Sequence, residues 1–289
     1  MGAGAAPRVG TAAWNAARLA WRDRATASAR ALIARRSAPP ARVESLAPGE
    51  HLAPAPAPHH RPRFAEPWPP GSPVSVLRAR HVIDGACHLG DCARLAAAAA
   101  ASLGVLRQRD GEASVTALGD VAADVIGEDA HAAVRRLVRE MTAAASAVAR
   151  ERLYPAGGLL THIVPGDVPG DGAHGYWSAH VDKANVPEYD VSAVLYLSDG
   201  DGAHFRGGEL WFLDGDGDEG GNGDGDGDGD GDGSERVTRR ELIPARGRLV
   251  VFGSGEENVH AVRPVVEGQR ATLNLWLTRD ARVASEYHP

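Results

Sequence analysis

The chain has few of the residues that cross-link a protein or anchor it in a lipid bilayer. It contains two cysteines, Cys87 and Cys92, among 289 residues, which excludes a disulfide scaffold. No long uninterrupted apolar run occurs, and the most apolar stretch, residues 95–105, is alanine-rich and too short to cross a bilayer. We therefore expect no transmembrane segment.

Basic charge is not in excess either. The formal net charge is −7, but an alternating Asp-Gly run at residues 214–233 holds eight Asp, one Glu and no Lys or Arg. The rest of the chain therefore carries about +2, which is near neutral and does not indicate a nucleic-acid partner. The contents of hydrophobic residues, 43%, and charged residues, 24%, are those of a globular protein, so disorder of the whole chain is excluded.

The first part of the chain differs in composition from the rest. Residues 1–46 hold eight Arg against one Asp and one Glu, with Ala and Ser in most other places. This leader is typical of an organellar transit peptide, and equally of a disordered segment without a targeting role, so it assigns no compartment. Residues 47–73 are about one third proline, which predicts an extended linker with His59 and His60 as solvated residues.

Ordered structure is expected over residues 74–279, followed by a short tail, residues 280–289. Residues 74–82 have the composition of a strand. Two helices are predicted: residues 89–103 from their alanine content, and about 118–153 from apolar residues spaced three and four apart.

Two acidic residues and both cysteines lie near the start of the first predicted helix. Asp84 or Asp91 is available to cap that helix. Cys87 and Cys92 lack a second Cys pair or a close His cluster, so we interpret them as structural rather than zinc-binding.

The period of the sequence pattern changes to two from Leu159 onward. Seven short stretches separated by Gly, Pro, Asp and Asn alternate as strands do. They are residues 159–164, 176–181, 191–197, 209–213, 248–252, 259–266 and 270–278. Helices followed by at least seven strands indicate an α+β fold whose β part is a barrel or a sandwich.

The Asp-Gly run, residues 214–233, interrupts two of these strands. It cannot bury apolar area and its like charges repel, so the prediction is a disordered hairpin insertion. Calcium binding is the alternative, because Asp carboxylates are hard oxygen ligands. The run lacks the apolar and non-Asp positions of an EF-hand loop or a calcium-binding repeat, which favours the insertion.

A His and an Asp lie two positions apart in the segment YWSAHVDK. On a strand, His180 and Asp182 would face the same way and could reach one metal ion. Another His, His260, follows in the phrase NVH. Two His and one carboxylate leave coordination positions open, which suits non-haem Fe(II) and oxygen chemistry, although an HxD pair alone is common by chance.

Arg270 follows His260 across a short turn, so the chain returns beside the candidate metal ligands. Alternate residues of strand 270–278 form an apolar face, which should pack against the helices, and a polar face of Arg270, Thr272, Asn274, Trp276 and Thr278. A buried guanidinium needs an anionic partner, and a carboxylate-bearing cosubstrate would supply one in a bidentate contact. Tyr196, on the polar face of another predicted strand, could hydrogen-bond the same carboxylate.

Several phrases taken together resemble one family. Five phrases of the chain resemble the catalytic domain of 2-oxoglutarate- and Fe(II)-dependent oxygenases of the prolyl 4-hydroxylase type. They are HVD, LYLSD, FRGGELWF, PARGRLVVFGSGEENVHAV and GQRATLNLW. The similarity is greatest to the 2-oxoglutarate and iron-dependent oxygenase domain-containing protein 3 group. It covers roughly residues 74–279, with the motifs concentrated in 176–278. The Asp-Gly insertion and the lack of a membrane anchor depart from that group.

The resemblance implies a fold, cofactors and residue roles. The fold is a double-stranded β-helix core (jelly-roll, cupin-like) with N-terminal helices packed on one sheet. The cofactors are Fe(II) and 2-oxoglutarate, with ascorbate in addition. The implied roles concern six residues: His180, Asp182 and His260 as iron ligands, and Arg270, assisted by Tyr196 and Asn274, at the distal carboxylate of 2-oxoglutarate.

The implied reaction is hydroxylation of a peptidyl, prolyl-like residue by O2 with release of succinate and CO2. Two other functions stay open: a non-catalytic metal-binding β-barrel that serves as an interaction module, and a zinc-dependent hydrolase with the same three ligands. The intact set of ligands together with Arg270 argues against the first, and the second gives Arg270 no role. The expected partners are a protein or peptide substrate and O2.

Overall fold

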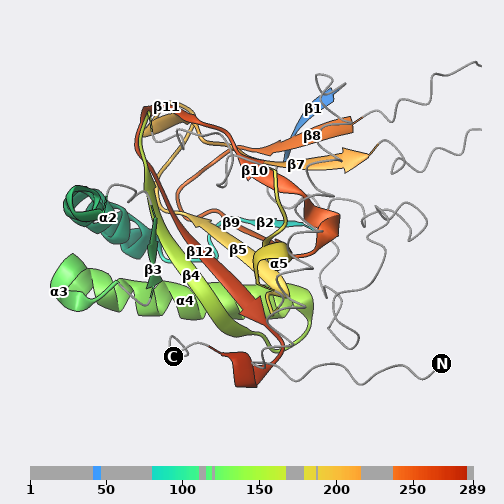
Figure 1. The fold of residues 1–289 in the computed structure, drawn as a ribbon, viewed down its shortest axis with the longest axis horizontal. Coiled ribbons are helices and arrows are strands. Elements are labelled where there is room, and N and C mark those ends of the chain that lie inside the picture. Colours follow the sequence, from blue (N-terminus) through green and yellow to red (C-terminus); the bar gives the residue numbers. More distant parts are fainter. Residues whose placement is uncertain are drawn as a thin grey trace, which may run out of the picture.

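A computed structural model describes most of the chain (Figure 1). The described residues are 42–46, 80–110, 115–118, 121–166, 179–186, 188–215 and 237–284. Within them, helices mainly precede strands. The strands form two main sheets that are mostly antiparallel. The predicted α+β class, in which helices combine with β-sheets, is confirmed. The predicted linker with His59 and His60, most of the leader and most of the Asp-Gly run lie outside the described residues.

A six-stranded antiparallel sheet contains the strand that begins at Arg270. Its strand order is β2-β9-β5-β12-β4-β3. The strands are β2 (His81–Ile83), β9 (Leu249–Gly253), β5 (Val191–Tyr196), β12 (Arg270–Thr278), β4 (Tyr154–Ile163) and β3 (Val115–Ala117). The central strand β12 pairs with β5 on one side and β4 on the other, so Thr272 lies beside Tyr196 and Thr161.

A four-stranded sheet packs against one face of the larger sheet. Its order is β1-β8-β7-β10, with β1 parallel to β8 and the other pairs antiparallel. The strands are β1 (Arg42–Leu46), β8 (Val237–Leu242), β7 (Leu210–Gly215) and β10 (His260–Val262), and a two-stranded ribbon adds β6 (Phe205–Gly207) and β11 (Val265–Gly268). Side chains from both sheets share one buried cluster: Val82, Tyr196, Leu210, Phe212, Leu242, Val250, Phe252 and Val262.

The two faces of the six-stranded sheet differ in chemistry, as the period of two predicts. The apolar face of β12 is buried together with the apolar face of β5 and with residues of the long helices, in a cluster that includes Ala271, Leu273, Leu275 and Leu277. The other face of β12 presents Arg270, Asn274 and Trp276 to a cavity. One strand therefore serves both the apolar core and the candidate site.

Two long helices, α2 (Leu89–Asp110) and α4 (Glu128–Ala149), contact each other and the six-stranded sheet. The helix predicted over 118–153 is wrong at both ends. Gly127, with a φ of 85°, separates α4 from the short α3 (Ala123–Ile126), and Arg150, with a φ of 53°, ends it. The helical spacing within α4 is confirmed by its buried residues, which are Ala130, Ala133, Val134, Leu137, Val138, Met141 and Ala145.

The two acidic residues proposed as helix caps serve a different purpose. Asp91 lies inside α2 and accepts hydrogen bonds from Arg136 of α4, at 2.7 Å from Nε and 2.8 Å from a terminal nitrogen. Asp84 accepts two hydrogen bonds from Arg248, at 2.8 and 2.9 Å. Both carboxylates therefore connect elements distant in the sequence, and the capping prediction is wrong.

Both cysteines lie in the core on the helix side of the six-stranded sheet. Cys87 and Cys92 are unpaired and buried in the helix-side core, where burial raises the pKa of the Cys92 thiol to about 11. Strands β1 and β8 were not predicted, and β1 lies at the end of the leader segment. No helix among the described residues is long and apolar enough to cross a membrane.

Candidate metal centre

Three side chains converge where β10 passes the segment around His180. The ligand atoms of His180, Asp182 and His260 all lie within 4.8 Å of one another. Nε2 of His180 is 3.6 Å from one carboxylate oxygen of Asp182, and Nε2 of His260 is 3.7 Å from the other. The two imidazole nitrogens and the carboxylate thus face a common point, which fits the donor set of a divalent transition metal.

The local backbone brings the three residues together in a different way from the predicted one. His180 is not in a strand but in an isolated bridge to His260, with reciprocal backbone hydrogen bonds of 2.9 and 3.0 Å. Asp182 is the first residue of a helical turn, α5 (Asp182–Asn185), and Val181 between them is extended. The strand prediction for 176–181 is therefore wrong at its described end.

Asp182 is buried and fixed by hydroxyl groups. The Ser192 hydroxyl donates to its carboxylate at 2.6 Å and lies 2.7 Å from the Ser254 hydroxyl. Burial raises the pKa of Asp182, but attraction by His260 and His180, together with hydrogen bonds from His180 and Ser192, outweighs it and holds the pKa well below its usual value. Asp182 is therefore anionic at neutral pH, as a candidate metal ligand should be.

His260 is held in one orientation by its own backbone neighbourhood. Its Nδ1 lies 2.8 Å from the carbonyl oxygen of Asn258, so Nδ1 carries the proton and donates it, and Nε2 remains a lone-pair donor. Burial lowers the pKa of His260 to about 4, with repulsion from His180 in the same direction and attraction by Asp182 opposing it. The imidazole is therefore neutral at pH 7 and suited to bind a metal.

The three candidate ligands line a cavity of about 80 Å³. Its lining also includes Arg270 and Asn274, and so joins the candidate metal centre to the polar face of β12. Five of the six residues predicted for metal or cosubstrate therefore line one cavity, and Tyr196 alone among the six is not in the lining.

Arg270 is only 2% exposed. Its Nε donates to the carbonyl oxygen of Gly208 at 2.8 Å, and its guanidinium lies 5.2 Å from the centre of the Tyr196 ring. No carboxylate of the described residues forms an ion pair with it. Gly208 has a φ of 70°, and a Cβ there would lie 2.7 Å from Cδ of Arg270, so a glycine is needed to admit the arginine.

Tyr196 also has an unused polar group. The side chain is fully buried, and its hydroxyl has no hydrogen-bond partner within the described part of the chain. Burial raises the pKa of this phenol, so the group stays protonated and can donate. A buried guanidinium without a carboxylate and a buried hydroxyl without a partner fit a ligand with acceptor oxygens.

Sequence reasoning missed the residues that support the ligands. Lys183 is buried and donates to Asp190 at 3.0 Å and to the carbonyl oxygen of Tyr189 at 2.9 Å, which fixes the turn that starts at Asp182. The phrase HVDK contains this lysine, but its partner lies across the following loop and no local pattern identifies it. No sequence pattern indicates Arg80 either, although its side chain donates to Asn258 two positions before His260.

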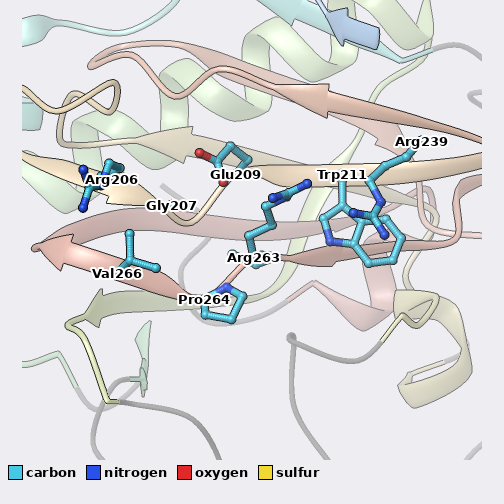
Figure 2. A pocket seen from close by; sticks show the side chains of 9 residues that line it. Arg206, Gly207, Glu209, Trp211, Arg239, Arg263, Pro264 and Val266 are labelled. Atoms are coloured by element: carbon cyan, nitrogen blue, oxygen red, sulfur yellow. The ribbon is translucent and has the colours of Figure 1, made fainter. Parts of the chain in front are cut away.

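A second and larger depression lies on the outer face of the four-stranded sheet. This groove, with a volume of about 550 Å³, is lined by Arg206, Gly207, Glu209, Trp211, Arg239, Val262, Arg263, Pro264 and Val266 (Figure 2). Arg239 lies over the Trp211 ring at 4.7 Å, and Arg263 donates to Glu241 at 2.8 Å. Among the residues that the structure describes, the groove holds no group of potential metal ligands, whereas the smaller cavity does.

Comparison with known sequences agrees with the geometry. Residues 170–278 match the sequence model of the 2OG-Fe(II) oxygenase superfamily. This part of the chain is therefore similar to 2OG-Fe(II) oxygenases, which use Fe(II) and 2-oxoglutarate.

Two named relatives are similar to part of this chain. The chain is 37% identical over 93 residues to prolyl 3-hydroxylase 1 of Gallus gallus, a match that covers 32% of this chain and 10% of the relative. It is 34% identical over 103 residues to 2-oxoglutarate and iron-dependent oxygenase domain-containing protein 3 of Xenopus tropicalis, covering 36% of this chain and 26% of the relative. The matches thus span only a tenth to a quarter of the length of these relatives.

Among solved structures, a prolyl-4-hydroxylase of Pseudomonas putida is similar at 20% identity and a TM-score of 0.40, covering 70% of this chain and 93% of that one.

Proposed function

We propose that the protein is an Fe(II)- and 2-oxoglutarate-dependent dioxygenase that hydroxylates a peptidyl, prolyl-like substrate and releases succinate and CO2. The observation that carries this proposal is the single cavity that joins a His-Asp-His set to a buried arginine without a carboxylate partner among the described residues. A zinc hydrolase or a binding module would use the three ligands but would leave that arginine without a role.

The proposed roles follow from the chemistry of the side chains. His180, Asp182 and His260 would hold Fe(II) and leave further coordination positions open. Arg270 would bind the distal carboxylate of 2-oxoglutarate, because a planar guanidinium forms paired hydrogen bonds with a carboxylate. Tyr196 would donate its hydroxyl to the same carboxylate, and Asn274 would contribute from the cavity wall.

When bound, iron with 2-oxoglutarate and O2 supplies the oxidant that hydroxylates a C–H bond. The residues of the chain hold, orient and shield. Ser192 keeps the Asp182 carboxylate anionic and in place, and the Asn258 carbonyl keeps the proton of His260 on Nδ1. The apolar residues that close the cavity, among them Phe252 and Val262, keep bulk water away from the reacting groups.

The peptidyl substrate rests on the relatives. Prolyl 3-hydroxylase 1 is named for hydroxylating proline. Residues 170–278, which match the superfamily model, include all three proposed ligands and Arg270. We also infer that the two sheets form the double-stranded β-helix expected from the sequence, and that ascorbate acts as a reductant as it does in the resembled family.

The proposal is tested by measuring succinate formation. Purified protein is supplied with Fe(II), 2-oxoglutarate and O2, with a proline-rich peptide or with the same peptide carrying Ala in place of Pro. Succinate should rise with the proline peptide, and the peptide should gain one oxygen atom by mass spectrometry. Arg263→Ala, in the outer groove, should behave as wild type, and His180→Ala should be inactive. A wild-type protein that binds Fe(II) but decarboxylates no 2-oxoglutarate would contradict the proposal.

A further inference from the structure

Arg80 lies immediately before β2 and is 5% exposed. Its Nε donates to the side-chain oxygen of Asn258 at 2.7 Å, and a terminal nitrogen donates to the carbonyl oxygen of Glu257 at 3.4 Å. The two bonded side chains are 178 positions apart in the sequence. Arg80 thus connects the first described strand of the domain to the turn before β10.

Asn258 is clamped from both sides. It is 1% exposed and ends the short helical turn Glu256–Asn258 between β9 and β10. Its side-chain nitrogen donates to the carbonyl oxygen of Gly253 at 2.9 Å, while its oxygen accepts from Arg80. The backbone carbonyl of the same residue accepts from Nδ1 of His260 at 2.8 Å. The position of that carbonyl is therefore fixed by the amide side chain.

The guanidinium of Arg80 also bears on the packing around His260. It lies 4.2 Å from the centre of the Phe212 ring, in the range of a cation–π contact. The Phe212 ring is 5.8 Å from the imidazole of His260, and Phe252 packs edge-on against the same imidazole at 4.9 Å. Arg80 thus contacts both Asn258, whose carbonyl accepts from His260, and Phe212, whose ring lies near the same imidazole.

We propose that Arg80 is a positioning residue for the metal centre: through Asn258 it fixes the carbonyl that holds Nδ1 of His260, and so directs Nε2 toward Asp182 and the ion. The inference rests on the proposed function, since it concerns an ion held by His180, Asp182 and His260. Arg80 lies outside the family-matched residues 170–278, so the centre depends on a residue that the family match does not include.

Arginine suits this position better than lysine. Its planar fork bonds the amide oxygen of Asn258 and a neighbouring carbonyl at once, and its flat face lies on Phe212. A lysine keeps the charge and one donor but loses the fork. We therefore expect Arg80→Lys to retain part of the effect and Arg80→Met, which keeps the apolar stem alone, to lose it.

The test is a double-mutant cycle on metal affinity in full-length, metal-free protein. Co(II), as a stand-in for Fe(II), is titrated by calorimetry into wild type, Arg80→Met, Asn258→Ala and the double variant. Loss of a group that orients a metal-bound His weakens binding by about 10- to 100-fold. Each single variant should bind Co(II) about 10-fold more weakly, and the double variant no more weakly than the weaker single one. Arg136→Met, which removes an arginine paired with Asp91 on the helical side, should bind as wild type.

A second measurement separates positioning from general damage. The tautomer of His260, read from its side-chain ¹⁵N shifts in metal-free protein, should be the Nδ1-protonated form in wild type and a mixture in Arg80→Met and Asn258→Ala. Arg80→Lys should restore part of the Co(II) affinity and of the tautomer, and it replaces Arg80→Met in the cycle if that variant does not fold.

The outcomes are distinguishable. Wild type that binds no Co(II) overturns the proposed function and this inference with it. Wild type that binds Co(II), with folded Arg80 and Asn258 variants that bind equally well, overturns the inference alone. Additive losses of Co(II) affinity in the double variant would show that Arg80 does not act through Asn258.

Discussion

The small cavity at His260 and the larger groove over Trp211 are separated by one sheet, and their arginines differ in whether they have a carboxylate partner. In the larger groove each lining arginine has a carboxylate nearby: Arg263 bonds Glu241 at 2.8 Å, Arg206 lies 3.3 Å from Glu267, and Arg239 lies 3.7 Å from Glu241. In the smaller cavity Arg270 has no carboxylate partner among the described residues, and the hydroxyl of the neighbouring Tyr196 has no hydrogen-bond partner there either. A buried arginine without a carboxylate partner among the described residues, rather than cavity volume, therefore distinguishes the candidate site.

The strongest test of this difference is the removal of the carboxylate in the small cavity. Asp182→Ala should abolish Fe(II) retention and 2-oxoglutarate turnover, because two imidazoles alone form a weak site. Metal content by mass spectrometry and succinate release measure the two effects. Asp280→Ala, which removes a partly exposed carboxylate paired with Arg282, is the matched control and should behave as wild type. Turnover at the wild-type rate in Asp182→Ala would show that the ligand assignment is wrong.

The second test concerns the arginine of the same cavity. Losing one partner of a buried charge-assisted contact costs about 2–5 kcal/mol. Arg270→Ala should therefore raise the apparent KM for 2-oxoglutarate by roughly 30- to 5,000-fold while the three ligands still hold iron. Arg270→Lys should lie between the two, because lysine keeps the charge but not the bidentate fork.

Equal affinity for 2-oxoglutarate in wild type and Arg270→Ala would rule out the cosubstrate role, even with a confirmed iron site. The control is Arg239→Ala in the groove, where the guanidinium lies on Trp211 and no cosubstrate is expected.

The third test uses pH on the metal-free protein. The pKa of His260 is lowered from 6.5 to about 4, so between these values the unfolded chain binds a proton that the folded chain does not. The free energy of unfolding should therefore fall as pH drops from 6.5 to 4, by up to about 3 kcal/mol from this residue. The lowered pKa of Asp182 acts in the same direction below its usual value. Urea unfolding at several pH values measures the slope.

His260→Gln should flatten that slope, and Trp211→Ala in the groove should leave it as in wild type. A His260→Gln protein with the wild-type slope would show that another group controls the acid sensitivity.

The smallest effect is expected in the groove. Arg263→Ala breaks the contact with Glu241, but the arginine side chain is 42% exposed and such a pair contributes about 0–1 kcal/mol. The melting temperature, the Co(II) affinity and the succinate rate should all stay close to wild type. A selective loss of turnover with peptide, at unchanged 2-oxoglutarate affinity, would mean that the groove contacts the substrate and would reverse the comparison between the two regions.

Much of the candidate site follows from sequence because its signals are periodic or local. Alternation in the strand from Arg270 to Thr278 correctly divides its residues between the helix-side core and the cavity. The grouping of His180, Asp182 and His260 was also anticipated, although the reason given for it, a shared strand face, is wrong. Two residues can meet at an ion by a bridge followed by a helical turn as well as by strand alternation.

The supporting contacts did not follow from sequence, because they join residues far apart. Nothing in the sequence near Arg80 indicates Asn258 as its partner. Nothing near Asp91 indicates Arg136, and the position of Asp91 near the start of a helix predicts a cap instead. The break between α3 and α4 depends on the positive φ of Gly127, which a glycine in a helical pattern permits but does not require. Local pattern thus predicts which face a residue occupies, whereas its partner depends on the tertiary fold.

The bridge between His180 and His260 has a consequence for how the chain is held together. The two residues belong to distant segments and exchange two backbone hydrogen bonds. An ion bound by both side chains would be a reversible cross-link that closes the long loop between them, much as a disulfide does in chains that contain one. Chelation would then act like reduction of a disulfide: the segment before α5 should become the first site of proteolytic cleavage, and added metal should protect it.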